Sequence, residues 1–338
     1  MEVTRVLPTD LEGIAAAHAV WHRAEQDMWP ERVGFSERDF RAMCGHVGGS
    51  RRFELHVARG ESGTVLGTGT MEIPLLENLH SVEMMVMVDP NGRRRGVGTA
   101  LVEHIASRAR ADGRRVLNSI VDVPVAVAQT HPSGPFARHL GFAATMAGNT
   151  RILRLPMDVT RMVELREAVA TARGADHYRT LTFTAPWPGE YVEDHCELRR
   201  RMSTDEPAGD GEREEEHWDA QRLADADRLF ADRGATVLVG AAEHVPSGRV
   251  VAMSEILLAE DTRRQAWQMI TVVHPEHRGH RLGLAVKVAN LTALMEVSPT
   301  VEFMITGNAA VNTPMIAVND MMGFEIDGIG NFWQRTLD

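Results

Sequence analysis

This chain contains the same strand–loop–helix pattern twice, and that repetition constrains its fold more than any other feature. The first copy spans Val88 to Leu101 and reads V-D-P-N-G-R-R-R-G-V-G-T-A-L, after an apolar, β-branched run. The second spans Val273 to Ala285 and reads V-H-P-E-H-R-G-H-R-L-G-L-A. Gly98 and Gly283 lie 185 positions apart, and a Gly-Phe dipeptide recurs farther along each half, at positions 141 and 323. We therefore predict a tandem duplication of one domain of roughly 150 residues, which is an ordinary domain size.

The loop of the first copy has the properties of an anion-binding site. Gly96 and Gly98 have no Cβ, so the backbone can approach a ligand closely. The loop amides and the N-terminus of the following helix point toward one place, which suits a phosphate or pyrophosphate group. Arg93, Arg94 and Arg95 add positive charge beside it. A Walker loop would need Gly-Lys-Ser/Thr and a dinucleotide-binding loop a third glycine, so neither of these two nucleotide-binding patterns fits.

The order of predicted strands and helices supports two similar halves. Between residues 3 and 155, apolar and β-branched runs predict mostly antiparallel strands, with two helices before the first loop, one directly after it and a short one ending at Gly141. Residues 158–175 predict a helical connector, after which the plan repeats. We expect an N-terminal domain at 1–157, the connector at 158–175 and a C-terminal domain at 176–338.

Charge and cysteine usage exclude several classes of protein. A net charge of −11 argues against general nucleic-acid binding, and no apolar run approaches the length of a membrane span. Cys44 and Cys196 fall in different predicted halves, so we expect no disulfide framework and a cytoplasmic location. Nothing near Met1 has the pattern of a signal segment. The expected partner is a small molecule, not a nucleic acid or a membrane, and the expected state is a monomer or homodimer.

Four basic side chains near the second loop allow two interpretations each. His274, His277 and His280 could ligate a metal ion or contact a phosphate. Because no cysteine lies nearby and a phosphate role is available, we expect no metal site. Lys287, the only lysine of the chain, either faces a ligand phosphate or lies on the surface of its helix.

The two loops resemble those of the GNAT acyltransferases. The run from Arg93 to Gly98 fits the family pattern Arg-x-x-Gly-x-Gly completely, whereas the second loop has Arg281 where the first glycine is expected. The stretch from His277 to Gly283, together with a set of downstream asparagines, is similar to the C-terminal halves of tandem GNAT proteins. The resemblance covers most of the chain. It implies an α/β (α+β) fold of two tandem GNAT domains, each a mixed, mostly antiparallel sheet flanked by helices and splayed at its centre.

The resemblance also implies acetyl-CoA, or another acyl-CoA, as the bound group. In the family the backbone of the fourth strand holds the pantetheine arm like an added strand, and the loop holds the pyrophosphate. In the N-terminal domain the corresponding residues are Val86, Met87, Val88, Arg93, Arg94, Arg95, Gly96, Val97, Gly98 and Thr99. In the C-terminal domain they are Thr271, Val272, Val273, Arg278, Gly279, His280, Arg281, Leu282, Gly283, Leu284, Asn308 and Asn312. Asn308 could instead end a strand and cap a helix.

Acyl transfer to an amine needs a base, because an alkylammonium must lose a proton before it attacks. Glu83 lies on the strand that enters the first loop, where many family members keep a catalytic glutamate, although it could also be a plain surface carboxylate; Glu54 is a weaker choice. In the second domain we expect Glu255, on the neighbouring strand, to be the base. The family's usual acid is a tyrosine, and Ala137 and Asn319 stand at its two positions. We expect Asn319 to donate to the leaving sulfur instead.

Two functions of different class follow from these residues. The first is an acyl-CoA-dependent N-acyltransferase acting on a small-molecule amine, with secondary metabolism such as antibiotic biosynthesis as its setting. The second is a non-catalytic acyl-CoA-binding sensor or scaffold, which the missing tyrosines favour. The asparagines of the second domain favour the first. We expect the N-terminal domain to bind acetyl-CoA more tightly and the C-terminal domain to be catalytic.

Overall fold

The repeated strand, loop and helix form the centre of each of two compact units in a computed structural model, which describes residues 1–205, 213–260 and 263–338. Unit 1 consists of Met1–Ala147 and Gly328–Asp338, and unit 2 of the described residues between 148 and 327. The predicted class, a mixed sheet flanked by helices, is confirmed. No helix of the described residues combines the length and the apolar character needed to cross a membrane.

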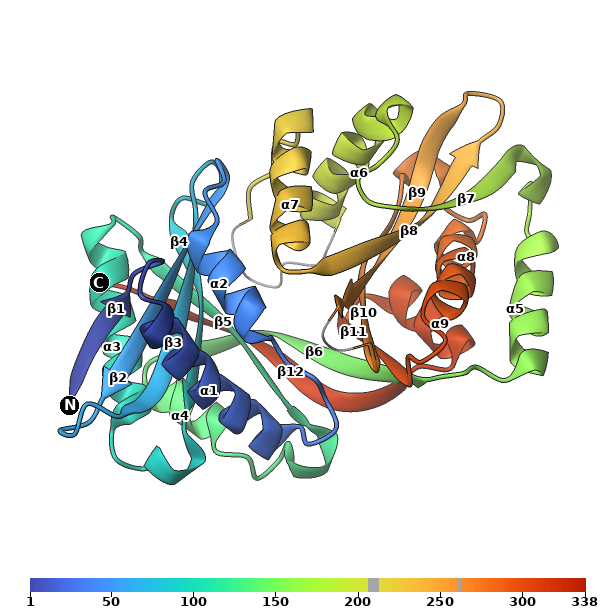
Figure 1. Ribbon diagram of the computed structural model, residues 1–338. Coiled ribbons are helices and arrows are strands. Elements are labelled where there is room, and N and C mark those ends of the chain that lie inside the picture. Colours follow the sequence, from blue (N-terminus) through green and yellow to red (C-terminus); the bar gives the residue numbers. More distant parts are fainter. Residues whose placement is uncertain (206–212, 261–262) are drawn as a thin grey trace. The chain divides into compact units, whose positions relative to one another are not determined.

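Unit 1 is built on a sheet with strand order β1-β2-β3-β4-β5-β12. Neighbouring strands are antiparallel, except that β4 and β5 are parallel. Its strands are β1 (Glu2–Val6), β2 (Arg51–Arg59), β3 (Val65–Pro74), β4 (Ser81–Val88), β5 (Val116–Pro124) and β12 (Glu325–Thr336). Its helices are α1 (Leu11–Met28), α2 (Glu37–Gly45), α3 (Val97–Ala111) and α4 (Ser133–His139). Helices α1 and α2 cover one face of this sheet, and α3 and α4 cover the other (Figure 1).

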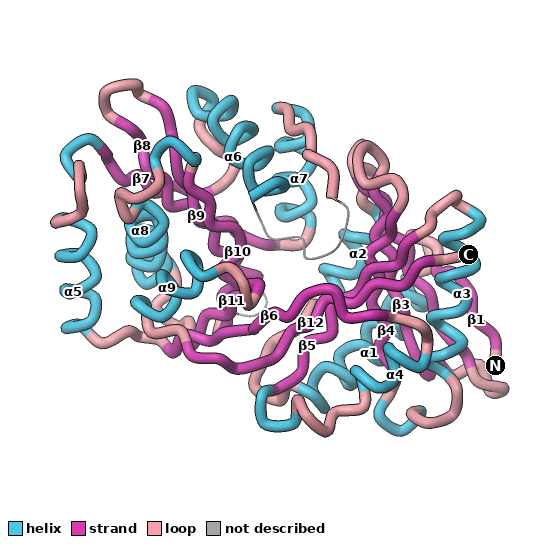
Figure 2. Tube along the Cα trace, turned by 180° about the vertical axis from the view of Figure 1, so that it is seen from behind, coloured by secondary structure: helices cyan, strands magenta, loops and turns pink. Residues whose placement is uncertain are grey.

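Unit 2 repeats this plan with strand order β7-β8-β9-β10-β11-β6. Here β10 and β11 form the parallel pair, and the other pairs are antiparallel. Its strands are β6 (Ala143–Arg154), β7 (Tyr178–Thr184), β8 (Ala235–His244), β9 (Arg249–Ala259), β10 (Gln265–Val273) and β11 (Phe303–Ala309). Its helices are α5 (Val159–Ala170), α6 (Val192–Asp205), α7 (Ala220–Asp232), α8 (Leu282–Val297) and α9 (Thr313–Met322). The tube in Figure 2 shows α8 and α9 on one side of the sheet and α6 and α7 on the other.

The last strand of each sequence half belongs to the sheet of the other unit. Residues Gly148–Arg154 of β6 pair with β11 in unit 2, and residues Gly328–Thr336 of β12 pair with β5 in unit 1. The units therefore differ from the predicted ranges 1–157 and 176–338 by an exchanged strand, and the predicted connector forms α5 as part of unit 2. An alternating pattern shows that a segment pairs as a strand, but not which sheet edge it pairs with.

The backbone of the two loops repeats at the predicted offset. A single 3₁₀ turn follows each central strand, at Pro90–Gly92 and at Pro275–His277. Two residues then have positive φ in each loop: Arg94 (63°) and Gly96 (79°) in the first, Gly279 (84°) and Arg281 (55°) in the second. Glycine and arginine thus exchange places within one loop conformation, and the left-handed residue before the helix is Gly96 in unit 1 and Arg281 in unit 2.

Candidate functional site

The first loop borders a cavity of about 410 Å³ in unit 1. Nine of the ten residues predicted to hold CoA in the N-terminal domain line it: Val86, Met87, Val88, Arg93, Arg94, Gly96, Val97, Gly98 and Thr99. Arg95 is exposed and lies outside the lining. A Cβ placed on Gly98 would lie 3.0 Å from Phe136 Cζ and 3.5 Å from Val88 Cγ2, so the glycine keeps this part of the cavity open.

The N-terminus of α3 supplies anion-binding groups to this cavity. The first hydrogen bond of the helix runs from Ala100 N to Gly96 O, so the amides of Val97, Gly98 and Thr99 have no partner within the helix. These donors and the helix dipole favour a negative group at this end. Arg93 and Arg94 add side-chain charge, with Arg93 held by Asp27 at 2.6 Å. This end of the cavity therefore suits a pyrophosphate.

Strands β4 and β5 separate just beyond Glu83. Their parallel pairing is limited to Ser81–Val116, Val82–Leu117 and Glu83–Asn118, after which β4 continues to Val88 with no β5 residue opposite it. The stretch without a β5 partner contains Val86, Met87 and Val88, which pair with β3 on their other edge and line the cavity. An extended group can lie along such a strand edge and bond its backbone. Glu83 therefore lies at the point where the splay begins.

Glu83 belongs to a row of polar side chains that crosses three strands of unit 1. Asn118 Nδ2 donates to Glu83 Oε1 at 2.9 Å, and Gln334 Nε2 donates to Asn118 Oδ1 at 3.2 Å. Glu83 is half-buried, so its carboxylate can exchange protons with a bound molecule. By contrast Glu54 is 1% exposed and bound by Arg108 at 2.9 and 3.1 Å. Desolvation would raise the pKa of Glu54, but the hydrogen bonds from Arg108 and the charges of Arg5 and Arg108 outweigh it and lower this pKa to about 2.

Several cavity residues were missed from the sequence. They come from α1 and from the segment around α4, and they are Ala24, Met28, His131, Pro132, Ser133, Phe136 and His139. His131 Nδ1 lies 2.8 Å from Ser133 Oγ. Burial, followed by the charge of Arg93, lowers the pKa of His131 and favours its neutral form. Pro132 and Gly134 break regular structure in this segment, but nothing in the local sequence indicates that it lines the cavity.

The side chains of the second loop form hydrogen bonds with other residues of unit 2. His280 Nδ1 lies 2.6 Å from Arg173 O, and Arg281 Nη1 donates to Ala168 O at 3.2 Å, so both side chains bind the end of the connector. Arg278 bonds Asp205 at 2.5 Å. Leu282 and Leu284 are buried in the core. The two cavities described in unit 2 lie elsewhere, one beside α6 and one between α5 and α8, and neither is lined by residues 278–284.

Glu255 does not have the freedom of a general base. It is 3% exposed, and Arg199 Nη2 donates to both of its carboxylate oxygens at 2.8 and 3.0 Å. His195 Nε2 lies 3.4 Å away. Although burial opposes it, the charge of Arg199 keeps the pKa of Glu255 below its usual value. The assignment of Glu255 as the base of the second domain stays a prediction, and the structure places its carboxylate in a buried ion pair with Arg199 of α6, a partner that sequence spacing did not reveal.

The predicted asparagines of unit 2 are bound to each other and to the backbone. Asn312 caps α9 by accepting from Met315 N at 3.3 Å. Asn319 donates to Asn308 Oδ1 at 3.3 Å and accepts from Lys287 Nζ at 2.6 Å. Lys287 is 1% exposed, so it neither lies on the helix surface nor faces a phosphate from solvent. The side-chain amides of these asparagines are thus bound within the protein. Because Asn319 is fully buried, the structure does not support the expectation that it donates to a leaving sulfur.

Comparisons with known proteins agree with this architecture. Residues 19–142 match the sequence model of the Acetyltransferase (GNAT) family. The chain is similar to a tandem GNAT protein from the clavulanic acid biosynthesis pathway, with 24% identity, a TM-score of 0.81 and coverage of 100% of this chain and 98% of that one. It is also similar to a GCN5-related N-acetyltransferase from Sphaerobacter thermophilus, with 13% identity, a TM-score of 0.64 and coverage of 99% and 95%. Among curated proteins no match was found. The match to the Acetyltransferase (GNAT) family model thus covers residues 19–142, and the chain as a whole has the fold of the tandem GNAT protein.

Proposed function

We propose that this protein is a cytoplasmic acyl-CoA-dependent N-acyltransferase, acting as a monomer or homodimer, with its acyl-CoA bound in unit 1. The observation that carries the proposal is the continuity of the unit 1 cavity. It begins at the free amides of Val97, Gly98 and Thr99 and follows the unpaired edge of β4. Glu83, where β4 and β5 part, lies on the same strand edge three positions before Val86 and outside the lining of the cavity. A pyrophosphate, an extended arm and a reactive end would occupy these three places in order.

The chain's own residues supply what the transfer requires. Acyl-CoA brings a thioester carbonyl that an amine can attack. Glu83 accepts a proton from the incoming ammonium, directly or through water, and Asn118 holds the carboxylate in place. The amine nitrogen forms the new amide bond as the C–S bond breaks. Because a thiol has a pKa of about 8.5, the departing thiolate leaves with little help and takes up a proton from water, and the proton accepted by Glu83 is released to solvent.

The acceptor is proposed to be a small-molecule amine of secondary metabolism. This part rests on the similarity to a protein of the clavulanic acid biosynthesis pathway. The polar row Glu83–Asn118–Gln334 on the sheet of unit 1 is suited to a cationic group. Two apolar side chains, Met85 and Ile120, are exposed next to this row, at 37% and 48%. An acceptor with one amine and an apolar part fits this surface.

A second candidate function is acyl-CoA binding without turnover. It is favoured by the side chains at the family's acid positions, because Ala137 cannot donate a proton and Asn319 is fully buried. The groups of the second loop are also bound by the chain itself. In this alternative the cavity of unit 1 would hold acyl-CoA as a signal or as a structural ligand.

The test is turnover of acetyl-CoA with a panel of small amines, read by release of free thiol. We expect amine-dependent thiol release, and a loss of kcat of about a hundredfold in Glu83→Gln with little change in CoA affinity, since a positioned base contributes ~10²–10⁴-fold. The matched control is Glu72→Gln, because Glu72 lies opposite Glu83 on β3 and pairs with the surface residue Arg51.

The two candidate functions give opposite results in this assay. Binding of CoA with no thiol release above hydrolysis for any amine would support the non-catalytic alternative. Equal rates for Glu83→Gln and Glu72→Gln would remove Glu83 from the mechanism.

A further inference from the structure

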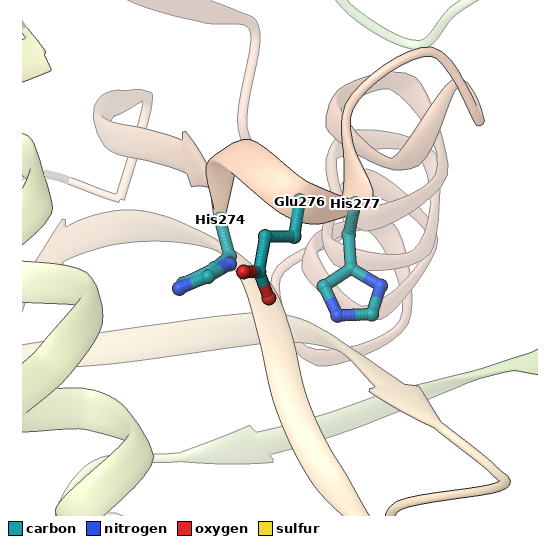
Figure 3. A group of neighbouring side chains, drawn as sticks. All are labelled: His274, Glu276 and His277. Carbon is teal, nitrogen blue, oxygen red and sulfur yellow. The ribbon is translucent and has the colours of Figure 1, made fainter.

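Three side chains at the end of β10 gather potential metal ligands in one place. His274, Glu276 and His277 each present a nitrogen or oxygen atom, and the three atoms lie within 4.8 Å of one another. Figure 3 shows the carboxylate of Glu276 between the two imidazole rings. All three come from one short stretch, the 3₁₀ turn Pro275–His277 and the residue before it. The three proposed ligands therefore all come from one local stretch of backbone.

The atoms needed for coordination are available. Nδ1 of His274 is buried without a hydrogen-bond partner among the described residues, and its Nε2 lies 3.8 Å from Glu197 Oε1. Nδ1 of His277 bonds the Tyr178 hydroxyl at 3.0 Å, which leaves Nε2 open. Metal-binding imidazoles commonly have their second nitrogen fixed in this way by a carboxylate or another polar group. The carboxylate of Glu276 makes no ion pair or hydrogen bond with any residue in the described ranges.

The corresponding 3₁₀ turn of unit 1 has no histidine at these three positions, and its one carboxylate is already bound. Asp89, Asn91 and Gly92 occupy the three positions that are His274, Glu276 and His277 in unit 2, at the offset of 185. The carboxylate of Asp89 forms an ion pair with Arg23 at 2.7 Å and accepts a hydrogen bond from the amide of Asn91 at 3.0 Å. The two turns therefore share a backbone conformation but have different side chains at the three positions. Only the second set combines two imidazoles and an unpaired carboxylate.

We propose that His274, Glu276 and His277 bind one divalent transition-metal ion, with Zn²⁺ as the reference ion. Two imidazoles and one carboxylate are a ligand set typical of zinc, and they leave a fourth position for water or an anion. Ca²⁺ and Mg²⁺ prefer sites made only of oxygen atoms, so this set does not suit them. The bound ion would fasten the turn to the end of β10. The site is independent of the acyl-transfer proposal, since it lies in unit 2 and none of its residues lines the unit 1 cavity.

Two nearby histidines, His244 and His280, are not part of the proposed ligand set. His244 provides the control for the experiment. The ring of His244 lies 4.7 Å from that of His277, but its Nδ1 bonds Ser247 Oγ at 2.9 Å. Nδ1 of His280 is hydrogen-bonded to the carbonyl oxygen of Arg173. Substitution of His244 changes the local number of histidines without removing a proposed ligand.

The experiment measures Zn²⁺ binding to the tag-free, full-length protein after treatment with EDTA and desalting. We expect one equivalent of Zn²⁺ per chain, in competition with a chromophoric chelator. Glu276→Gln should weaken binding about a hundredfold or more, since loss of an outer-shell partner alone costs ~10–100-fold. Because Glu276 is exposed, this variant should unfold at the same temperature as the wild type without metal. His244→Ala should bind within twofold of the wild type.

Cobalt provides an independent readout of the ligands. Co²⁺ bound to the wild type and to His244→Ala should give the intense visible absorption of a four-coordinate ion, and Glu276→Gln should lose it. The proposal is overturned if the wild type binds less than stoichiometric Zn²⁺. It is equally overturned if Glu276→Gln binds like the wild type, or if His244→Ala loses the ion while Glu276→Gln retains it.

Discussion

Lys287 has an ionisable side chain in an environment that opposes its charged form. It is fully buried on α8, donates to Asn319 Oδ1 at 2.6 Å and lies 5.1 Å from the ring centre of Phe324. Burial, followed by the positive charge of Arg151, lowers its pKa from 10.5 to about 7. The ammonium form is therefore penalised in the folded state, and Asn319 and Phe324 offset only part of that penalty.

This burial predicts an unusual dependence of stability on pH. Between pH 7 and 10.5 the unfolded chain binds the proton of Lys287 more tightly than the folded chain, so the free energy of unfolding should rise with pH through this window. The shift corresponds to a penalty of up to about 5 kcal/mol below pH 7. Lys287→Met should remove the rise, as measured by urea unfolding between pH 6.5 and 9.5. Equal slopes in the two proteins would mean that Lys287 titrates normally.

The exchanged strands β6 and β12 make each unit depend on a segment from the far half of the chain. Trp333 of β12 is 4% exposed in the core that includes Val102, Ile105 and Leu117 of unit 1. Leu153 of β6 is 5% exposed in the core formed by α5, α8 and α9 of unit 2. Each strand therefore stabilises its unit through buried side chains as well as through the hydrogen bonds of the sheet.

A substitution in β6 should destabilise unit 2 and one in β12 should destabilise unit 1, although each strand comes from the opposite half of the sequence. Trp333→Ala should cost unit 1 about 3–5 kcal/mol, and Leu153→Ala should cost unit 2 about 2–5 kcal/mol. Hydrogen exchange read peptide by peptide distinguishes them. Trp333→Ala should speed exchange in β3 and leave β9 protected, and Leu153→Ala should do the reverse. Faster exchange in β9 than in β3 for Trp333→Ala would contradict the exchange of strands.

Across the whole molecule, the sequence predicted features that depend on local backbone. Glycines and helix starts identified the first loop, and nine of its ten predicted residues line the cavity, because a loop's conformation is encoded by the residues within it. The repeat was visible for the same reason, since the offset of 185 relates both the 3₁₀ turns and the left-handed residues.

The features that the sequence did not predict depend on contacts between distant segments. Glu255 became a buried ion pair because α6 places Arg199 against it, 56 positions away in sequence. His280 and Arg281 were assigned to a phosphate, whereas the end of α5 and the residues after it provide carbonyl groups for them. The exchange of β6 and β12 was invisible because their alternating patterns fit either sheet edge. The transfer of the proposed chemistry from unit 2 to unit 1 follows from these contacts.

The number of CoA molecules bound by two matched variants tests the assignment of acyl-CoA to unit 1. A Cβ on Gly98 meets Phe136 and Val88 at 3.0 and 3.5 Å beside the cavity, whereas a Cβ on Gly283, its counterpart, meets only Val273 at 3.7 Å. By isothermal titration calorimetry with acetyl-CoA, we expect one site per chain in the wild type and in Gly283→Val, and no measurable site in Gly98→Val. Loss of binding in Gly283→Val with a full site in Gly98→Val would place acyl-CoA in unit 2 and contradict the assignment.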